Sequence, residues 1–206
     1  MVVIKMKKGE KIAFGKYVWR ILDVDEDRVL IITEDIIEKR SYHHKYEEVT
    51  WEACSLRSYL NSEFLDQFSA DEKARILLTT IQNQDNQWYG TDAGVATYDY
   101  IFLLDIEEVV CKYFGDSCHH LQNRRPSERY WFGKKDENNS KRIARHKGED
   151  WGSWWWLRTP GKNNKDAVYV HGDGNVGING NSVFFRRFGP ERDGGIRPAL
   201  WLKHVD

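Results

Sequence analysis

Four tryptophans fall within six positions in the stretch WGSWWWLRTPG, residues 151–161. If WWWLRT forms a strand, its side chains alternate between two faces, with Trp154, Trp156 and Arg158 on one and Trp155, Leu157 and Thr159 on the other. Both faces then carry large side chains that favour burial. The stretch predicts a central strand packed on both sides, with the Arg158 guanidinium stacked on an indole or paired with a carboxylate. The alternative is an aromatic platform for a ligand.

Strand patterns occupy the first third of the chain, and helical patterns follow them. YVWRILDVD, residues 17–25, and DRVLIITED, residues 27–35, mix β-branched and aromatic residues around a polar turn, which predicts a hairpin. In SLRSYLNSEFLDQF, residues 55–68, apolar side chains recur at intervals of three and four residues. This spacing predicts one helix or two short ones, with Ser55 as the N-cap.

Two capping-box patterns predict further short helices. Ser69 with Glu72 begins the first, and Asp105 with Glu108 begins the second, after a buried strand expected at residues 100–104. The polar segment 134–150 has almost nothing apolar to bury. We therefore expect a solvated loop there.

Strand patterns return after residue 150. Glycines at positions 172, 174, 177 and 180 suit tight turns between short strands. Pro198 predicts a strand start, an edge or a bulge, because proline cannot donate to a ladder. Strands, then helices, then a run of strands predict an α+β fold, and 206 residues favour a single domain, residues 1–206.

Composition argues against several classes of function. A formal net charge of −1 lacks the positive field of non-specific nucleic-acid binders, so we expect no nucleic-acid partner. No segment approaches the length of an apolar membrane span, and we expect a soluble chain. Three cysteines are an odd number, which argues against a disulfide framework and favours a reducing, cytoplasmic compartment. No complete catalytic motif occurs.

Residue types that bind metals are present, but their spacing matches no known site. The zinc candidates are His43, His44, Cys54, Cys111, Cys118, His119 and His120, without any C-x-x-C or H-x-x-x-H pair. The calcium candidates are Asp166, Asp173, Asn175, Asn179 and Asn181, which do not follow the EF-hand order. We predict no metal site, with buried, apolar cysteines and surface histidines; calcium is the alternative cofactor.

Five segments, in order, resemble a bacterial domain family of unknown function that is common in gut Firmicutes. They are YVWRILDVD, TWEACSLRSYLNSEF, WWWLRTPG, VHGDGNVG and GIRPALWLK. The C-terminal part of that family is similar to the C-type lectin fold, as found in formylglycine-generating enzymes and in the variable proteins of diversity-generating retroelements. The resemblance implies a C-type-lectin-like fold, with twisted, mostly antiparallel sheets and two to three short helices in the N-terminal half.

Two of the activities that this fold carries do not suit the chain. A resemblance to formylglycine-generating enzymes would imply a copper oxidase that uses a cysteine pair near the C-terminal core. In this chain, no cysteine follows Cys118. The Glu-Pro-Asn and Gln-Pro-Asp calcium motifs of sugar-binding C-type lectins are also missing. The variable proteins bind through residues near the C-terminus, and residues 169–192 are rich in the residue types that they use.

The chain is therefore predicted to be a non-enzymatic binding module for a protein or glycan ligand. The candidate binding residues are Tyr169, His171, Asp173, Asn175, Asn179, Asn181, Phe184, Phe185, Arg186 and Arg187. One alternative is an ordinary surface loop at these positions. Others are an enzyme with a site in the cleft beneath Trp154 and Arg158, and a structural domain of a larger assembly.

Overall fold

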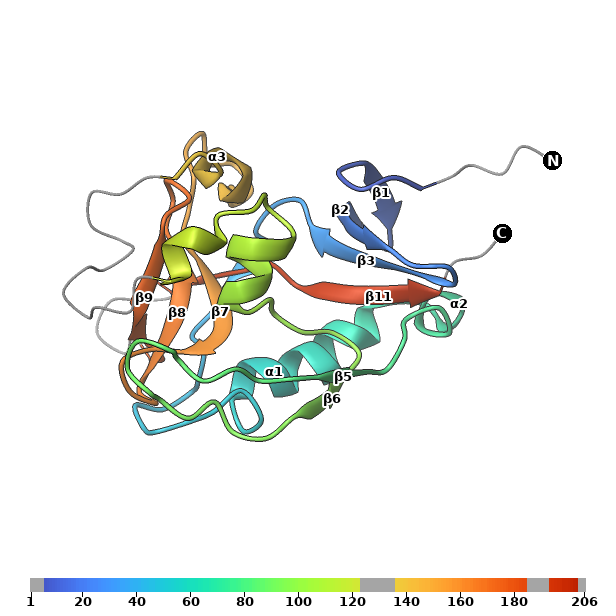
Figure 1. The fold of residues 1–206 in the computed structure, drawn as a ribbon. Coiled ribbons are helices and arrows are strands. Elements are labelled where there is room, and N and C mark those ends of the chain that lie inside the picture. Colours follow the sequence, from blue (N-terminus) through green and yellow to red (C-terminus); the bar gives the residue numbers. More distant parts are fainter. Residues whose placement is uncertain (1–5, 123–135, 185–192, 204–206) are drawn as a thin grey trace.

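The structure is a computed structural model that describes residues 6–122, 136–184 and 193–203. Its strands form three sheets, with short helical segments between them (Figure 1). The predicted α+β class is thus confirmed.

The first sheet has the strand order β1-β2-β3-β11 and is antiparallel throughout. Its strands are β1 (Lys11–Phe14), β2 (Tyr17–Val24), β3 (Arg28–Thr33) and β11 (Ala199–Lys203). β2 and β3 pair across the polar turn, which confirms the predicted hairpin. Five of the six residues of β3 are buried, because β3 is an inner strand of this sheet.

The second sheet has the strand order β4-β10-β7-β8-β9. Its strands are β4 (Glu38–Lys39), β10 (Gly195–Ile196), β7 (Trp155–Pro160), β8 (Asp166–Val170) and β9 (Val176–Ser182). Its pairs are antiparallel except for β10 with β7. β7 lies in the middle and every residue of it is buried, which confirms the central strand predicted for WWWLRT.

The chain between β10 and β11 passes from the second sheet to the first. Pro198 lies directly before β11, at the strand start that its missing N–H requires. A third sheet joins β5 (Thr79–Ile81) to β6 (Thr97–Asp99). The strand predicted at residues 100–104 is wrong: residues 101–104 are buried, but within the described ranges the segment makes only an isolated bridge from Phe102 to Ala199 and a single backbone hydrogen bond from Arg158 of β7 to Leu104, too few contacts for a ladder.

The first helical region is continuous but changes its period. It consists of α1 (Ser55–Tyr59), the π-helical turn η1 (Leu60–Phe64) and the 3-10 turn η2 (Leu65–Gln67). The predicted N-cap is one residue off: Cys54 is the cap, because its Sγ accepts a hydrogen bond from the Arg57 N–H at 3.3 Å.

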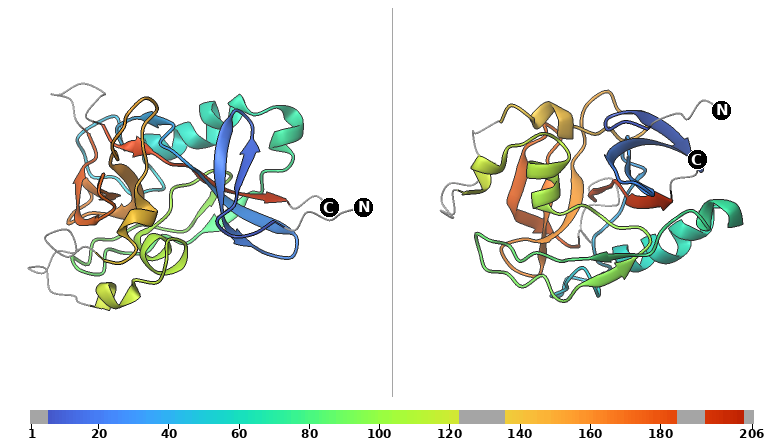
Figure 2. Two further views of the ribbon diagram at one scale, coloured as in Figure 1. Left: turned by 90° about the horizontal axis from the view of Figure 1, so that it is seen from above. Right: turned by 45° about the vertical axis from the view of Figure 1, so that its right-hand side comes forward.

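Both predicted capping boxes form. In α2 (Ala70–Lys73), the Ser69 hydroxyl accepts from the Glu72 N–H while the Glu72 carboxylate accepts from the Ser69 N–H. Asp105 and Glu108 exchange the same two bonds, both 2.8 Å long, at the start of η3 (Glu108–Lys112). The segment that carries η3 lies beside the second sheet (Figure 2).

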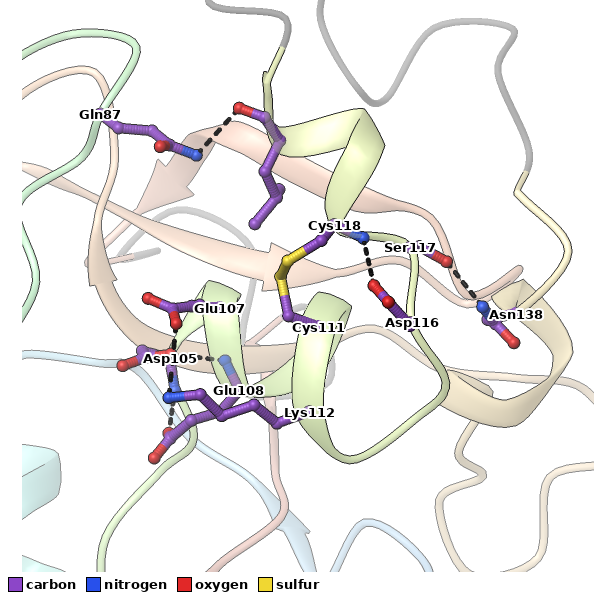
Figure 3. The surroundings of a disulfide bond; sticks show 11 residues. Gln87, Asp105, Glu107, Glu108, Cys111, Lys112, Asp116, Ser117, Cys118 and Asn138 are labelled. Carbon is purple, nitrogen blue, oxygen red and sulfur yellow. Dashed lines mark hydrogen bonds and ion pairs between the residues drawn. A yellow bond between two sulfur atoms is a disulfide. The ribbon is translucent and has the colours of Figure 1, made fainter.

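Cys111 and Cys118 form a disulfide bond between η3 and η4 (Cys118–Gln122), as Figure 3 shows. The expectation that all three cysteines are unlinked apolar side chains is therefore wrong, and it holds for Cys54 alone. The chain reverses between the two helical turns at Gly115, whose φ is +95°, and this brings the two Cα atoms within 4.8 Å. Because disulfides persist mainly in oxidising compartments, the cysteine count no longer favours the cytoplasm.

The described part of segment 134–150 is also not the solvated loop that its composition predicts. It contains α3 (Asn139–Arg142), and four polar residues there are buried: Asp136, Asn138, Asn139 and Arg142. These side chains can be buried because they satisfy one another's hydrogen-bonding groups. Arg142 Nη2 donates to Asp136 Oδ2 at 2.6 Å and to Asn139 Oδ1 at 2.7 Å. Polar composition therefore misled the prediction, since paired polar groups can replace apolar ones in an interior.

Candidate ligand-binding site

Tyr169 lies in the second sheet, beside the tryptophans of β7. β8 pairs Tyr169 with Trp156 on one side and with Gly177 on the other. The Trp154 ring meets Tyr169 edge-on with centroids 5.3 Å apart, and it meets Trp156 at 4.6 Å. A Cβ at position 177 would lie 2.5 Å from the Tyr169 ring, so glycine makes room for this ring. Tyr169 is thus part of an aromatic face, and burial raises its pKa to about 12.

His171, Asp173 and Asn175 form a hydrogen-bonded turn between β8 and β9. Asp173 Oδ1 lies 3.0 Å from His171 Nδ1 and accepts from the Asn175 backbone N–H at 3.0 Å. The His171 and Asp173 side chains are 44% and 36% exposed, whereas Asn175 is 5% exposed. The turn therefore presents an imidazole and a carboxylate to solvent and uses Asn175 internally.

Contacts with α3 hold this turn in place. Asn139 Nδ2 donates to Asn175 Oδ1 at 2.6 Å, and Arg142 Nε donates to the Gly174 carbonyl at 2.9 Å. Gly174 has a φ of +85°, and a Cβ there would overlap the Asn139 carbonyl. The backbone of the turn is therefore fixed by buried polar groups.

The next predicted residues lie on β9, which is at one edge of the second sheet as the described residues form it. Asn179 and Asn181 are half-buried. Asn181 Oδ1 accepts from the Ser182 N–H at 3.1 Å, and the described residues supply no side-chain hydrogen bond to Asn179. Phe184 follows β9 and packs, partly buried, against the core. The remaining three candidates, Phe185, Arg186 and Arg187, lie outside the described residues.

A polar cavity of about 460 Å³ lies beside Phe184. Its walls come from residues 40–44, from one side of α1 and η1, and from Asp193. The Ser41 hydroxyl donates to Asp193 at 2.8 Å, and His43 Nδ1 accepts from the Ser55 N–H at 3.1 Å. Its volume is that of a small-ligand site; its hydroxyl and imidazole groups can donate and accept hydrogen bonds, and its carboxylates can accept them.

The expected cleft beneath Trp154 and Arg158 is not shared by these two residues. Arg158 lines a cavity of about 290 Å³ with Asp105 and Glu108, and Trp154 is not part of its wall. Burial raises the pKa of Glu108, against the opposing charge of Arg158. Arg158 donates to Glu108 at 2.6 Å and to Asp105 at 2.7 Å, which confirms its predicted carboxylate pairing. Both carboxylates thus stabilise one guanidinium, an arrangement that suits a structural clamp better than a general base.

Metal-binding residue types come together at one place in the described ranges. The ligand atoms of His119, His120 and Glu137 lie within 4.8 Å of one another. Both histidines were zinc candidates from the sequence, whereas Glu137 was not. The calcium candidates do not converge in this way, because Asp166 begins β8 and Asp173 follows its other end.

A protein-family profile matches residues 26–204, and its description is "domain of unknown function" (DUF6273). The chain belongs to this family. The DUF6273 match runs from the turn before β3 to just beyond β11, so it includes all of the second sheet. No curated protein and no solved structure matches the chain. In the described ranges, no helix is long and apolar enough to cross a membrane.

The residues that position the 171–175 turn were missed by sequence reasoning. Asn139 and Arg142 support the turn from a segment that reads as solvated, about thirty residues earlier in the chain. The sequence signal for a fixed turn was Gly174. A glycine indicates that the backbone needs a special conformation there, but it does not indicate which segment contacts the turn.

Proposed function

We propose that this DUF6273 domain is a non-enzymatic binding module that presents a C-terminal surface to a protein or glycan ligand. The display surface is defined as the 171–175 turn, β9 and Phe184. The observation that carries the proposal is the contrast between its fixed backbone and its accessible side chains. Val176 and Ile178 are fully buried and anchor β9, while Asn179 and Asn181 on the same strand remain half exposed.

A fixed backbone favours binding, because the ligand does not have to order it. Asn and Asp side chains supply adaptable hydrogen bonds, and Tyr169 and Phe184 supply aromatic area beside them. The polar cavity next to Phe184 adds a concave part to the display surface.

We further infer a C-type-lectin-like core of the kind found in retroelement variable proteins, in one bacterial domain over residues 1–206. The mostly antiparallel sheets and the position of the display surface near the C-terminus support this inference. The calcium candidates are spread over the start of β8, the 171–175 turn and β9, so we expect ligand binding to persist in a chelator.

The test compares the wild-type protein with the variant His171→Ala/Asn179→Ala/Asn181→Ala, on a glycan array and in affinity capture from bacterial lysate. Gly174 and Asn175 are left unchanged because they hold α3. The matched control, Lys16→Ala/Val18→Ala/Glu26→Ala, removes three exposed side chains from the first sheet and its turn.

We expect the display-surface variant to lose at least about tenfold in affinity, since three hydrogen-bonding side chains contribute roughly 1 kcal/mol each. The control variant should bind as the wild type does. Equal binding by all three folded proteins would overturn the proposal.

A further inference from the structure

Arg197 is a buried cation without a carboxylate partner among the described residues. It is 2% exposed, and its guanidinium lies over the Trp155 ring, 4.8 Å from the centroid. Nε and Nη2 donate to the Thr33 carbonyl at 3.1 and 3.0 Å, while Nη1 has no hydrogen-bond partner. Burial lowers the pKa of Arg197 to about 10, which leaves it charged at neutral pH. Among the described residues, backbone carbonyls and aromatic rings thus hold a positive charge in the interior, and no carboxylate pairs with it directly.

Arg197 forms part of the wall of a cavity of about 540 Å³. The cavity lies between β2, the end of η3 and the chain around α3. Six basic residues and two acidic residues line it, which gives a formal excess of four positive charges. The basic residues are Lys8, Arg20, Lys112, Lys141, Arg145 and Arg197, and the acidic ones are Glu34 and Asp35.

Three of these basic side chains already have acidic partners. Arg20 donates to Glu34 at 2.8 Å, Lys8 lies 2.6 Å from Asp23, and Lys112 lies 3.4 Å from Glu107. By contrast, Lys141 and Arg145 are exposed and make no ion pair within the described ranges. The remaining positive charge of the cavity therefore comes from Lys141, Arg145 and Arg197, and among the described lining residues Asp35 is the one acid left to oppose these three.

We propose that this cavity binds a small organic anion through its phosphate or carboxylate group. Lys141 and Arg145 would contact the anionic group, and Arg197 would contribute the charge at the buried wall. Guanidinium groups bind phosphate and carboxylate with two parallel hydrogen bonds, which favours these ligands over halide ions. Phe114 and Ile143 also line the cavity and can pack against an apolar part of the ligand.

This site is independent of the proposed function. No residue of the display surface lines the cavity, so each proposal can fail without the other. The alternative is that Glu34 and Asp35 balance the positive charge of the cavity and that no ligand binds there.

The experiment is isothermal titration calorimetry of the full chain with inorganic pyrophosphate and, separately, with citrate, at constant ionic strength in chloride. We expect saturable binding of at least one probe, and the preferred probe distinguishes a phosphoryl ligand from a carboxylate ligand. In the variant Lys141→Gln/Arg145→Gln, the Kd should rise at least tenfold. The matched control, Lys16→Gln/Lys45→Gln, removes two exposed charges outside the cavity and should bind normally.

A second variant, Arg197→Met, tests the buried charge with an apolar side chain of similar length. If it folds, we expect pyrophosphate and citrate binding to weaken at least tenfold; if it does not fold, the double variant decides alone. The proposal is overturned if neither probe saturates with the wild type, or if the double variant binds as tightly as the control.

Discussion

Three buried arginines are stabilised in three different ways. Arg142 pairs with Asp136, and both side chains of this pair are fully buried. Arg158 is shared by Asp105 and Glu108. Arg197 contacts backbone carbonyls and aromatic rings, with no carboxylate beside it in the part of the chain that the structure describes. Because an unpaired buried charge is costly, these differences predict how each site responds to substitution.

The Asp136–Arg142 pair should be essential for stability. Arg142→Met leaves the Asp136 carboxylate buried without a counter-ion, and we expect the free energy of unfolding to fall by about 3 to 5 kcal/mol. The double variant Asp136→Asn/Arg142→Met removes both charges and should lose less. Urea denaturation of the three proteins measures this, and a loss below about 1 kcal/mol in the single variant would contradict the buried pairing.

Glu34 should make the free energy of unfolding depend on pH. Burial alone would raise its pKa, but hydrogen bonds from Arg20 and Lys11 outweigh this and lower the pKa below its ordinary 4.5. An acid with a lowered folded-state pKa stabilises the fold above its unfolded pKa, and this contribution is lost as the pH falls through the folded-state value. Glu34→Gln should therefore cost about 1 kcal/mol at pH 7 and progressively less below pH 4.5. A cost that stays constant down to pH 2 would show that the charge has no role.

At the scale of elements, the display surface depends on how one turn is held. The 171–175 turn connects two strands of the second sheet, and its far side packs on α3 through Gly174 and Asn175. The second constraint is covalent: the disulfide joins η3 to η4 on either side of Ser117, whose hydroxyl accepts from Asn138 Nδ2, directly before α3, at 2.7 Å. Both constraints can be tested by small substitutions.

Two glycines with the same backbone angle separate conformational strain from close packing. Gly148 and Gly174 both have a φ of +85°, but a Cβ at position 148 meets nothing within 4 Å. Gly148→Ala should cost about 1 to 2 kcal/mol, the cost of the left-handed conformation. Gly174→Ala adds the overlap with Asn139, and we expect about 2 kcal/mol more. Equal melting temperatures for the two variants would mean that α3 does not contact the turn as described.

The disulfide should stabilise the fold by closing a short loop. For a sequence separation of 7, loop-closure entropy gives about 2 to 3 kcal/mol. Dithiothreitol should therefore lower the melting temperature of the wild type to that of Cys111→Ala/Cys118→Ala, and leave the double variant unchanged. A wild-type melting temperature that does not respond to the reductant would argue against the bond.

At the scale of the whole molecule, local signals predicted well and long-range polar contacts did not. The tryptophan strand and both capping boxes were predictable because each depends on residues within a few positions. The Asp136–Arg142 pair and the Cys111–Cys118 bond could not be predicted, since polar composition or cysteine count does not show which side chains a fold brings together. Of the candidate binding residues, Tyr169, Asn179 and Asn181 lie on β8 and β9 of the second sheet, and their role in binding remains a prediction.

The most direct test of the binding proposal is site-specific photocrosslinking in living cells that express the protein. A benzoylphenylalanine replaces Asn179 on the display surface or, as the matched control, Val18, which is 52% exposed on β2. Val18 lies outside the display surface, so it reports non-specific contact. We predict a crosslinked protein or glycoconjugate at position 179 that is absent at position 18. The same products at both positions, or none at position 179, would contradict the proposed display surface.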